Sequence, residues 1–410
     1  MRVCFVSRRY FPAISGMSVY AENLLRELVA LGHEVTLISQ YRGDAFGKRV
    51  YGGGPPPPVP GVHVIGREQL GEQNGGDFER DVDDLVATIV AEHERRRFEV
   101  IHAQYGYPCG WAALLASRQT GVPNVISIQG GDGHWVGSCC RTHELAMQRV
   151  IEHGGAVLIG GASFVDEVAA RLGVARERFT LVPGAVDTAR FYPNRNGTRH
   201  AAATEPVLLF HGRIDRRKGA LDFVEACTGL AAQGRTFHAL FTGIGPDSDA
   251  VRDAVALSPH REHFEIRGYV GYDDVPAVYR EVDVFVSPTY AEGFSNTILE
   301  AMASGLPIVA CRVVGVVDAL RDDQNAVLVE PGDVAALTAA LEALLADGAR
   351  RRRLGAAALA ECRTTYAWPR VAATIAEVYA RVVAAGEPDL DWSPDLPRDP
   401  CRFRETPHLL

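Results

Sequence analysis

Short apolar runs alternate with amphipathic patterns along most of the chain. The runs VCFVS, EVTLIS, EVIHAQ and NVISIQ have the length of buried strands, whereas VYAENLLRELVALG and DFERDVDDLVATIVAEHERR carry apolar residues at helical spacing. This alternation predicts an α/β fold in which a parallel sheet has helices on both faces. The Gly- and Pro-rich region from Tyr51 to Gly76 is predicted to be a loop.

The alternation is interrupted once and then starts again. After the polar stretch around VPGAVDTARFYPNRNGTRHAAATEP, new strand patterns follow in VLLFHG, FHALFTG, FEIRGYV, DVFVSP and PIVA. This predicts two doubly wound domains, residues 1–190 and 200–370, that face a central cleft. The Pro- and Asp-rich tail, residues 387–410, is predicted to be weakly ordered. Ligands of such sheets bind beyond the carboxyl ends of the strands, so the site is expected in the strand-to-helix loops.

Composition and charge exclude several classes of protein. The 410 residues are 47% hydrophobic and 23% charged, and the net charge of -9 argues against general nucleic-acid binding. The chain shows neither a membrane-spanning run nor a signal peptide, and its eight cysteines lack CxxC spacing, so we expect a cytoplasmic protein with reduced thiols. HWVGSCCRTH gathers His134, Cys139, Cys140 and His143, but adjacent cysteines do not easily supply two tetrahedral ligands, and no metal is expected.

The stretch HGRIDRRKGALDFVEA joins a predicted strand to a helix that starts near Gly219. Arg213 and Lys218 lie in the connecting loop, and Lys218 and Lys48 are the only lysines of the chain. A helix N-terminus offers unpaired N–H groups and partial positive charge, which together with these two cations suit a diphosphate. A charged surface loop is the alternative interpretation.

The stretch YAEGFSNTILEAMASGLPIVA follows a second strand. Ser295 is predicted to cap a helix in which Glu300 lies about one turn beyond Asn296, and Glu292 lies in the preceding loop. Carboxylates accept hydrogen bonds from vicinal hydroxyls well. If the N–H groups of residues 293–295 meet a phosphate, the two glutamates flank it and bind a sugar and a ribose. The alternative is that both glutamates merely complement the helix dipole.

These two motifs together resemble the retaining glycosyltransferases of the GT-B fold, family four. The resemblance covers about residues 1–385 and includes FTGIGPD, IRGYVGYDDVPAVYREVDVFVSPT and YAWPRVAATIAEVY. It implies two Rossmann-like domains, with the C-terminal helix, about residues 370–386, packing back on the first. It also implies a donor site, in which Arg213 and Lys218 hold the diphosphate, Glu292 binds the sugar and Glu300 the ribose. The remaining donor-site residues implied are Gly16, Gly243, Tyr269, Val270, Gly293, Phe294 and Ser295.

On the acceptor side the chain departs from the family pattern. Gln104 and Gln129 stand where many members have histidine, and glutamine cannot act as a general base. Proton handling then falls to Asp132 or His134, or no protein base is needed, because the family's favoured mechanism passes the acceptor proton to the departing phosphate oxygen. For His134 an ordinary loop histidine is the alternative. The acceptor side is expected to include Tyr105, Tyr107 and Gln129, with Trp111 and Trp135 nearby.

The resulting hypothesis is a retaining glycosyltransferase that moves a hexosyl group from a nucleotide-diphosphate sugar, UDP or GDP favoured, to a small soluble acceptor. Neither a metal nor another cofactor is expected, and Glu292 is the third candidate catalytic residue beside Asp132 and His134. A lipid- or glycan-directed enzyme of the same fold and a non-catalytic nucleotide-sugar-binding relative are the alternatives. A homo-oligomer stays open, and stable membrane insertion is not expected.

Overall fold

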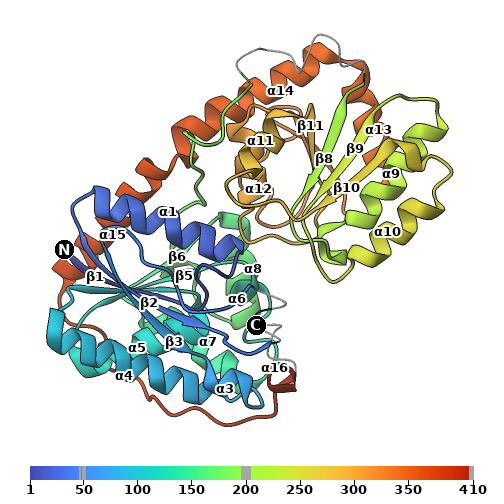
Figure 1. Cartoon of the computed structure of the whole chain (residues 1–410). Coiled ribbons are helices and arrows are strands. Elements are labelled where there is room, and N and C mark those ends of the chain that lie inside the picture. The colour runs from blue at the N-terminus through green and yellow to red at the C-terminus, as the bar shows by residue number, and fades with distance from the viewer. Residues whose placement is uncertain (46–47, 49–51, 195–204, 406–410) are drawn as a thin grey trace. The chain divides into compact units, whose positions relative to one another are not determined.

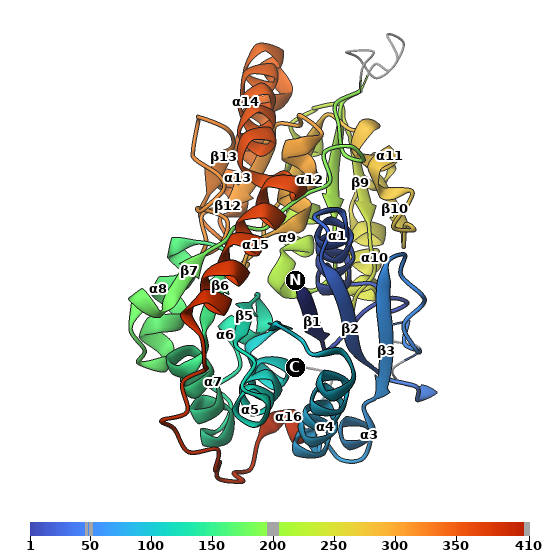
Figure 2. The same ribbon diagram turned by 90° about the vertical axis from the view of Figure 1, so that its left-hand side faces the viewer.

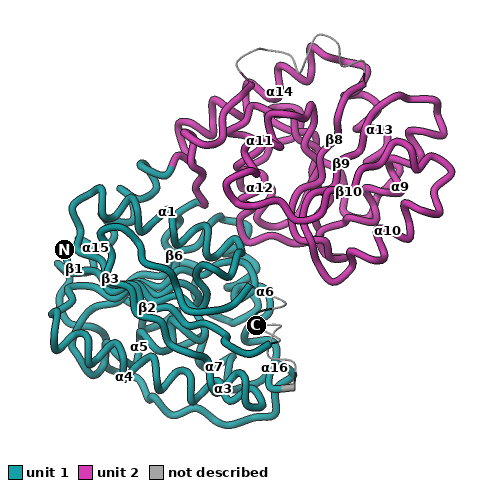
Figure 3. Tube along the Cα trace, in the orientation of Figure 1, with its two compact units in different colours: residues 1–183, 368–410 teal, residues 184–367 magenta. Residues whose placement is uncertain are grey.

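The computed structural model describes residues 1–45, 48, 52–194 and 205–405. The chain divides into two compact units, Met1–Pro183 with Trp368–Leu410 (unit 1) and Gly184–Ala367 (unit 2), shown in Figure 3. Residues 200–204, which sequence reasoning places at the start of the second domain, lie outside the described residues.

Unit 1 is built around a parallel sheet of seven strands in the order β3-β2-β1-β4-β5-β6-β7. Its strands are β1 (Arg2–Ser7), β2 (Glu34–Tyr41), β3 (Val62–Glu68), β4 (Val100–Gln104), β5 (Asn124–Ile128), β6 (Ala156–Ile159) and β7 (Phe179–Leu181). The helices and helical turns are α1 (Gly16–Ala30), α3 (Leu70–Gln73), α4 (Phe78–Arg96), η1 (Gly106–Gly110), α5 (Trp111–Thr120), α6 (Gly131–His134), α7 (Arg141–His153), α8 (Ala162–Leu172), η2 (Arg176–Arg178), α15 (Trp368–Ala385) and α16 (Arg402–Glu405).

Helices cover both faces of this sheet, as continuous apolar strands require. In Figure 1, α1 and α15 lie on one face and α4, α5 and α7 on the other. The strands β4 and β5 are buried at every position, so each strand contributes alternate side chains to two separate cores. The predicted doubly wound architecture is therefore confirmed.

One strand falls in the region that was predicted to be loop. β3 pairs in parallel with β2 over seven residues, from Val35 opposite Val62 to Tyr41 opposite Glu68. As the edge strand it is only partly covered, and each of its residues is half-buried or exposed. The Gly- and Pro-rich flanks hid this short pattern. The loop prediction is wrong for residues 62–68, and also for the short helix α3 at Leu70–Gln73.

The C-terminal part of the chain belongs to unit 1. α15 packs on α1 through an edge-to-face pair of Trp368 and Tyr20, and Figure 2 shows the red segment after α15 following unit 1 down to α16. Weak order was expected beyond residue 386, but Trp392, Cys401 and Phe403 are buried. These three side chains pack a polar segment against unit 1, which its composition alone did not indicate. The order of residues 387–410 stays a prediction.

Unit 2 contains a second parallel sheet, with six strands in the order β10-β9-β8-β11-β12-β13. Its strands are β8 (Val207–His211), β9 (His238–Thr242), β10 (Phe264–Gly268), β11 (Val284–Ser287), β12 (Ile308–Cys311) and β13 (Val327–Val329). The helices and helical turns are η3 (Arg216–Lys218), α9 (Ala220–Ala232), α10 (Ser248–Leu257), η4 (Arg261–His263), α11 (Val275–Arg280), α12 (Asn296–Ala303), α13 (Val334–Ala346), α14 (Gly348–Glu361) and η5 (Cys362–Tyr366).

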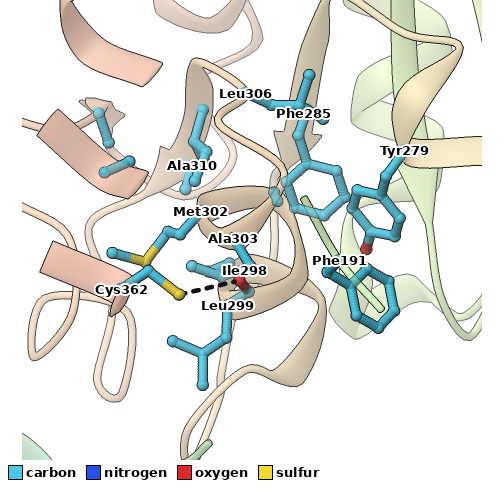
Figure 4. Packing of buried hydrophobic residues seen from close by; sticks show 14 of the residues in the cluster. Phe191, Tyr279, Phe285, Ile298, Leu299, Met302, Ala303, Leu306, Ala310 and Cys362 are labelled. Carbon is cyan, nitrogen blue, oxygen red and sulfur yellow. Dashed lines mark hydrogen bonds between the residues drawn. The ribbon is translucent and has the colours of Figure 1, made fainter. Parts of the chain in front are cut away.

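Alternate residues of these strands enter two cores. Leu208 and Phe210 of β8 face α9, α10 and α13, whereas Val207 and Leu209 face α11, α12 and α14. Figure 4 shows the second core, where Phe285 lies beside Tyr279 and the side chains of α12 fill the centre. The Cys362 thiol donates to the Leu299 carbonyl at 3.8 Å, which closes the end of this core. α12 is therefore firmly packed, and its N-terminus is held in a fixed position.

Among the described residues, no helix is both long and apolar enough to cross a membrane.

Candidate active site

In unit 2 the strand order reverses between β8 and β11, which are neighbours in the sheet. Loops that follow two such strands diverge to opposite faces and leave a ligand-binding crevice at their start. The loops after β8 and β11 meet here, since the Tyr290 N–H donates to the Arg217 carbonyl at 2.7 Å. Both predicted donor motifs therefore lie at the same end of the sheet.

Gly219 allows this close approach. It has φ +69° at the start of α9, and a Cβ atom on it would lie 2.0 Å from the Pro288 carbonyl oxygen. Only glycine combines a left-handed backbone with such proximity. The residue thus fixes the distance between the two loops.

Lys218 and Glu292 form an ion pair between the two loops. The Lys218 Nζ lies 2.6 Å from the Glu292 Oε1, and the side chains retain 31% and 14% of their exposure. An ammonium has three N–H donors, so Lys218 can bind Glu292 and another anion together. The structure thus brings together the cation of one motif and the first glutamate of the other.

Arg213 is the more exposed of the two predicted cations. Its Nε lies 3.2 Å from Asp215 Oδ2, and its side chain is 53% exposed. Asp215 is buried and also accepts from the Arg217 N–H at 2.9 Å. Sequence reasoning did not single out Asp215, which sets the shape of the loop; its position as the cap of a turn was the available signal.

The N-terminus of α12 lies next to this pair. Ser295 is the N-cap residue, as predicted, but its hydroxyl contacts Thr297 Oγ1 at 3.1 Å and does not cap a backbone N–H. The Phe294 ring packs against Tyr366 with ring centroids 5.7 Å apart, so its side chain is turned into the protein. A Cβ atom on Gly315 would lie 2.2 Å from the Glu292 carbonyl oxygen, which shows how tightly the loop after β12 supports this turn.

Glu300 is buried one turn into α12. Its Oε2 accepts a hydrogen bond from the Tyr279 hydroxyl at 2.9 Å. Burial raises the pKa of the Glu300 carboxyl to about 7, against the opposing effects of the Tyr279 hydroxyl and the Arg190 charge. The Tyr279 ring also contacts His211, the last residue of β8, edge to face with ring centroids 5.6 Å apart. Burial lowers the pKa of the His211 imidazole to about 4. Neither residue was predicted, although a histidine at a strand's carboxyl end was a usable signal.

The other predicted donor-side residues of unit 2 lie in the loops after β9 and β10. Gly243 has φ +121°, and a Cβ atom on it would lie 1.9 Å from the Gly212 carbonyl oxygen, so it lets two loops touch. Tyr269 is 54% exposed, and Val270 packs partly against the core of α11 and α12. These residues border the same end of the sheet.

In unit 1 the strand order reverses between β1 and β4. Gln104, the last residue of β4, accepts from the Ser7 hydroxyl at 2.7 Å and donates to Gln129 Oε1 and to the Met17 carbonyl, both at 3.0 Å. Gly16 is the first residue of α1, directly before Met17. The two glutamines thus join the loops after β1, β4 and β5 in one hydrogen-bonded network.

Asp132 has no exposed surface. Its oxygens accept from the backbone N–H groups of Gly106 and Gln129, both at 2.7 Å, and burial raises the pKa of its carboxyl to about 7. This carboxylate holds two loops together. Tyr105, whose φ is +82°, starts the first of these loops, and burial raises the pKa of its hydroxyl. These contacts place Asp132 at the junction of the loops after β4 and β5, and its role in proton transfer stays a prediction.

Tyr107 and His134, two further residues of the predicted acceptor side, are largely buried. The Tyr107 side chain is buried and packs on His143 with ring centroids 4.3 Å apart, and its place on the acceptor side stays a prediction. His134 is nearly buried, with Nδ1 at 2.6 Å from Glu167 Oε1 and its ring against Phe164. Within the described part of the chain, its Nε2 atom has no hydrogen-bond partner. Trp111 is buried against Trp392, whereas Trp135 is half-buried.

The chain matches two family models in sequence. Residues 15–185 match the glycosyl transferase 4-like domain, and residues 205–347 match glycosyl transferases group 1. With two Rossmann-like sheets, this makes the chain a glycosyltransferase of the GT-B fold. It belongs to the family-four, group 1 type of these enzymes, as the motifs predicted.

Two curated relatives span nearly the whole chain. The D-inositol 3-phosphate glycosyltransferase of Xylanimonas cellulosilytica is 28% identical over 89% of this chain and 91% of its own length. The glycogen synthase of Mycobacterium tuberculosis is 26% identical over 97% of this chain and 98% of its own.

Solved structures have the same fold. The sucrose-phosphate synthase of Thermosynechococcus elongatus superimposes with a TM-score of 0.78 at 22% identity, covering 94% of this chain and 100% of the other. The Anabaena protein HepE, solved with UDP and glucose, gives a TM-score of 0.74 at 15% identity over 93% of this chain and 100% of its own.

Proposed function

We propose that the protein transfers a hexosyl group, with retention of anomeric configuration and without a metal, from a UDP- or GDP-sugar to a small soluble acceptor. The observation that carries this proposal is the Lys218–Glu292 pair at the N-terminus of α12, with Glu300 one turn further on. The cation and the N-terminus of the helix suit the diphosphate of a nucleotide-diphosphate sugar. The two carboxylates suit the hydroxyl groups of its sugar and its ribose.

The diphosphate would lie between Lys218 and the N-terminus of α12. There Gly293, Phe294 and the N-cap residue Ser295 lead into α12, and the exposed Arg213 guanidinium lies in the facing loop. A helix end and fixed cations stabilise a leaving diphosphate without a metal ion. Lys218 would divide its three donors between Glu292 and a phosphate oxygen.

The glutamates would recognise hydroxyl groups. Glu292, still partly exposed, would accept from hydroxyls of the donor sugar. Glu300 would accept from the ribose, and because burial raises its pKa to about 7, such donors would stabilise the charged form that the protein alone disfavours. Tyr269 and Val270 would contact the base, and Gly243 and Gly16 would let the backbone approach the donor closely.

The proton of the acceptor would go to the departing diphosphate. In that step the bond between the anomeric carbon and the phosphate oxygen breaks, the acceptor oxygen bonds to the same face, and its proton moves to the phosphate oxygen. The buried Asp132 and the non-titrating Gln104 and Gln129 leave this route as the economical one. His134 and Tyr105 would position the acceptor.

The small soluble acceptor is supported by the name of the inositol phosphate-directed relative. The relative named for glycogen synthesis keeps a glycan acceptor as the second candidate. Eight free cysteines, six of them buried in the folded units, suit a reducing cytoplasm, where we place the activity.

The test is transfer itself. The protein is incubated in EDTA with UDP- and GDP-hexoses and with an inositol phosphate, a short glucan or lipid vesicles as acceptor. Release of nucleoside diphosphate and the anomeric configuration of the product, measured by NMR, are followed for the wild type, Glu292→Gln and Glu225→Gln.

We expect an α-linked product from an α-linked donor. The transfer rate should fall strongly in Glu292→Gln and change little in Glu225→Gln, which alters an exposed position of α9. A product of inverted anomeric configuration would refute retention. Transfer to glucan or lipid alone would refute the proposal of a small soluble acceptor. Nucleotide binding without turnover of any donor would make the chain a non-catalytic relative.

A further inference from the structure

Four potential metal ligands converge at one place in unit 1. Cys139 and Cys140 precede α7, His143 lies in its first turn, and Cys401 comes from the segment that leads into α16. The Sγ atom of Cys139 lies 3.1 Å from His143 Nδ1, and the Sγ atom of Cys401 lies 3.6 Å from it. The ligand atoms of all four residues lie within 4.8 Å of one another.

These separations are close to those of a tetrahedral zinc site. Zinc–sulfur bonds of about 2.3 Å and zinc–nitrogen bonds of about 2.0 Å place ligand atoms about 3.5–3.8 Å apart. The longest separation has to shorten by about 1 Å, which side-chain rotation can supply. A set of three thiols and one imidazole is among those that structural zinc sites use.

The surroundings suit this ion as well. His143 has no exposed surface, and its Nδ1 atom faces the sulfur atoms of Cys139 and Cys401. Zinc would displace the three thiol protons into solvent and leave a site of net charge -1. The charges of Arg171 and Arg404 lie near enough to interact with Cys139 and Cys401, and they would compensate it.

The sequence alone could not assemble this set. His134, the other candidate ligand of HWVGSCCRTH, lies with Glu167 and Phe164 instead. Its place is taken by Cys401, which follows His143 by 258 residues. Adjacent cysteines do not by themselves easily supply two tetrahedral ligands, but the fold brings a third thiol, that of Cys401, from a distant segment.

The position of the cluster suggests what it does. The C-terminal segment also contacts unit 1 through the Thr142 hydroxyl, which donates to the Pro397 carbonyl at 2.6 Å, and through Arg404 with Glu79. On its other side His143 packs on Tyr107, in the turn whose Gly106 N–H binds Asp132. We propose that Cys139, Cys140, His143 and Cys401 bind one structural zinc ion, which fastens the C-terminal segment to unit 1 and supports the loop after β4.

The test measures metal in the full-length protein. Zinc is quantified after purification without chelator, and after addition of Zn²⁺ followed by gel filtration, for the wild type, Cys401→Ala and Cys4→Ala. Cys4 is a matched control because it is a buried thiol of the same unit, in β1. Wild-type protein loaded with Co²⁺ is examined by visible absorption, and limited proteolysis follows cleavage between residues 386 and 400 with and without a strong chelator.

We expect about one zinc per chain in the wild type and in Cys4→Ala, and a loss of at least tenfold in affinity for Cys401→Ala. Co²⁺ should give the intense visible bands of a tetrahedral thiolate site, which decides the question even if Cys401→Ala does not fold. Chelation should expose the C-terminal segment to protease. Failure of the wild type to bind zinc, retention of zinc by Cys401→Ala, or a disulfide within the cluster in native protein would overturn the proposal.

Discussion

Replacing Glu300 by glutamine removes a buried charge from unit 2 and should stabilise the protein above neutral pH. Burial raises the pKa of this carboxyl from 4.5 to about 7. Glutamine has nearly the same shape and keeps an oxygen that accepts from the Tyr279 hydroxyl. The variant therefore isolates the desolvation of the charge.

The sign and size follow from proton linkage. Below pH 4.5 the carboxyl is protonated in the folded and the unfolded chain, so it lowers stability little. As pH rises from 4.5 to 7 the unfolded chain ionises first, and wild-type stability is progressively lost. At about 1.4 kcal/mol per pKa unit, the loss is about 1 kcal/mol at pH 5 and about 3 kcal/mol at pH 8.

The assay is calorimetric unfolding of both proteins at pH 5 and pH 8. For a domain of this size, about 1 kcal/mol corresponds to 2–4 °C in Tm. We expect the advantage of Glu300→Gln over wild type to grow by about 5–10 °C between pH 5 and pH 8. Glu225→Gln, the same change at an exposed position, should show no such growth. Equal pH dependence of wild type and Glu300→Gln would refute the claim that this carboxylate is desolvated.

Two further predictions concern stability, and each has a matched control. Gly219→Ala should lower the free energy of unfolding by at least about 2 kcal/mol, because its Cβ would lie 2.0 Å from the Pro288 carbonyl oxygen. Gly234→Ala, also at positive φ but in open space, should lower it by about 1 kcal/mol. Similar losses for the two variants in urea titrations would contradict the close approach at Gly219. Tyr379→Phe should lose about 1–3 kcal/mol, because the Tyr379 hydroxyl lies 2.5 Å from Nδ1 of the buried His102. Tyr20→Phe, which alters the same face of unit 1, should lower the free energy of unfolding by less. An equal loss in the two variants would contradict a stabilising role of the contact between Tyr379 and His102.

Local patterns predicted the parts of the fold that depend on neighbours in sequence. Apolar runs and helical spacing placed most strands and helices of both sheets, and the rule for ligands at strand ends led to Lys218, Glu292 and Glu300. Lys218 and Glu292 are 74 residues apart in sequence yet 2.6 Å apart in the structure, because β8 and β11 are neighbours. The parallel topology made that encounter foreseeable.

What the sequence did not reveal depends on partners that are distant along the chain. Burial of Asp132 and Tyr107 follows from loops that fold inward, and a polar or aromatic residue gives no sign of this by itself. Tyr279 reaches Glu300 from another helix, and Cys401 reaches His143 from the end of the chain. Sparse apolar residues such as Trp392 fix the C-terminal segment, although its composition resembles that of a disordered tail.

The donor site is tested most directly by titrating UDP, GDP and ADP into the protein by calorimetry with EDTA present. Wild type, Lys218→Ala and Arg217→Ala are compared, since the two variants remove the same charge from adjacent residues. Lys218 pairs with Glu292, whereas the Arg217 guanidinium pairs with Asp215.

We predict that one nucleotide binds the wild type without metal. Lys218→Ala should weaken it about 10- to 100-fold, as expected for a charge-assisted hydrogen bond of about 1.5–3 kcal/mol, and Arg217→Ala should have much less effect. Binding that needs a divalent metal, or equal affinity of Lys218→Ala and wild type, would contradict the placement of the diphosphate between Lys218 and α12.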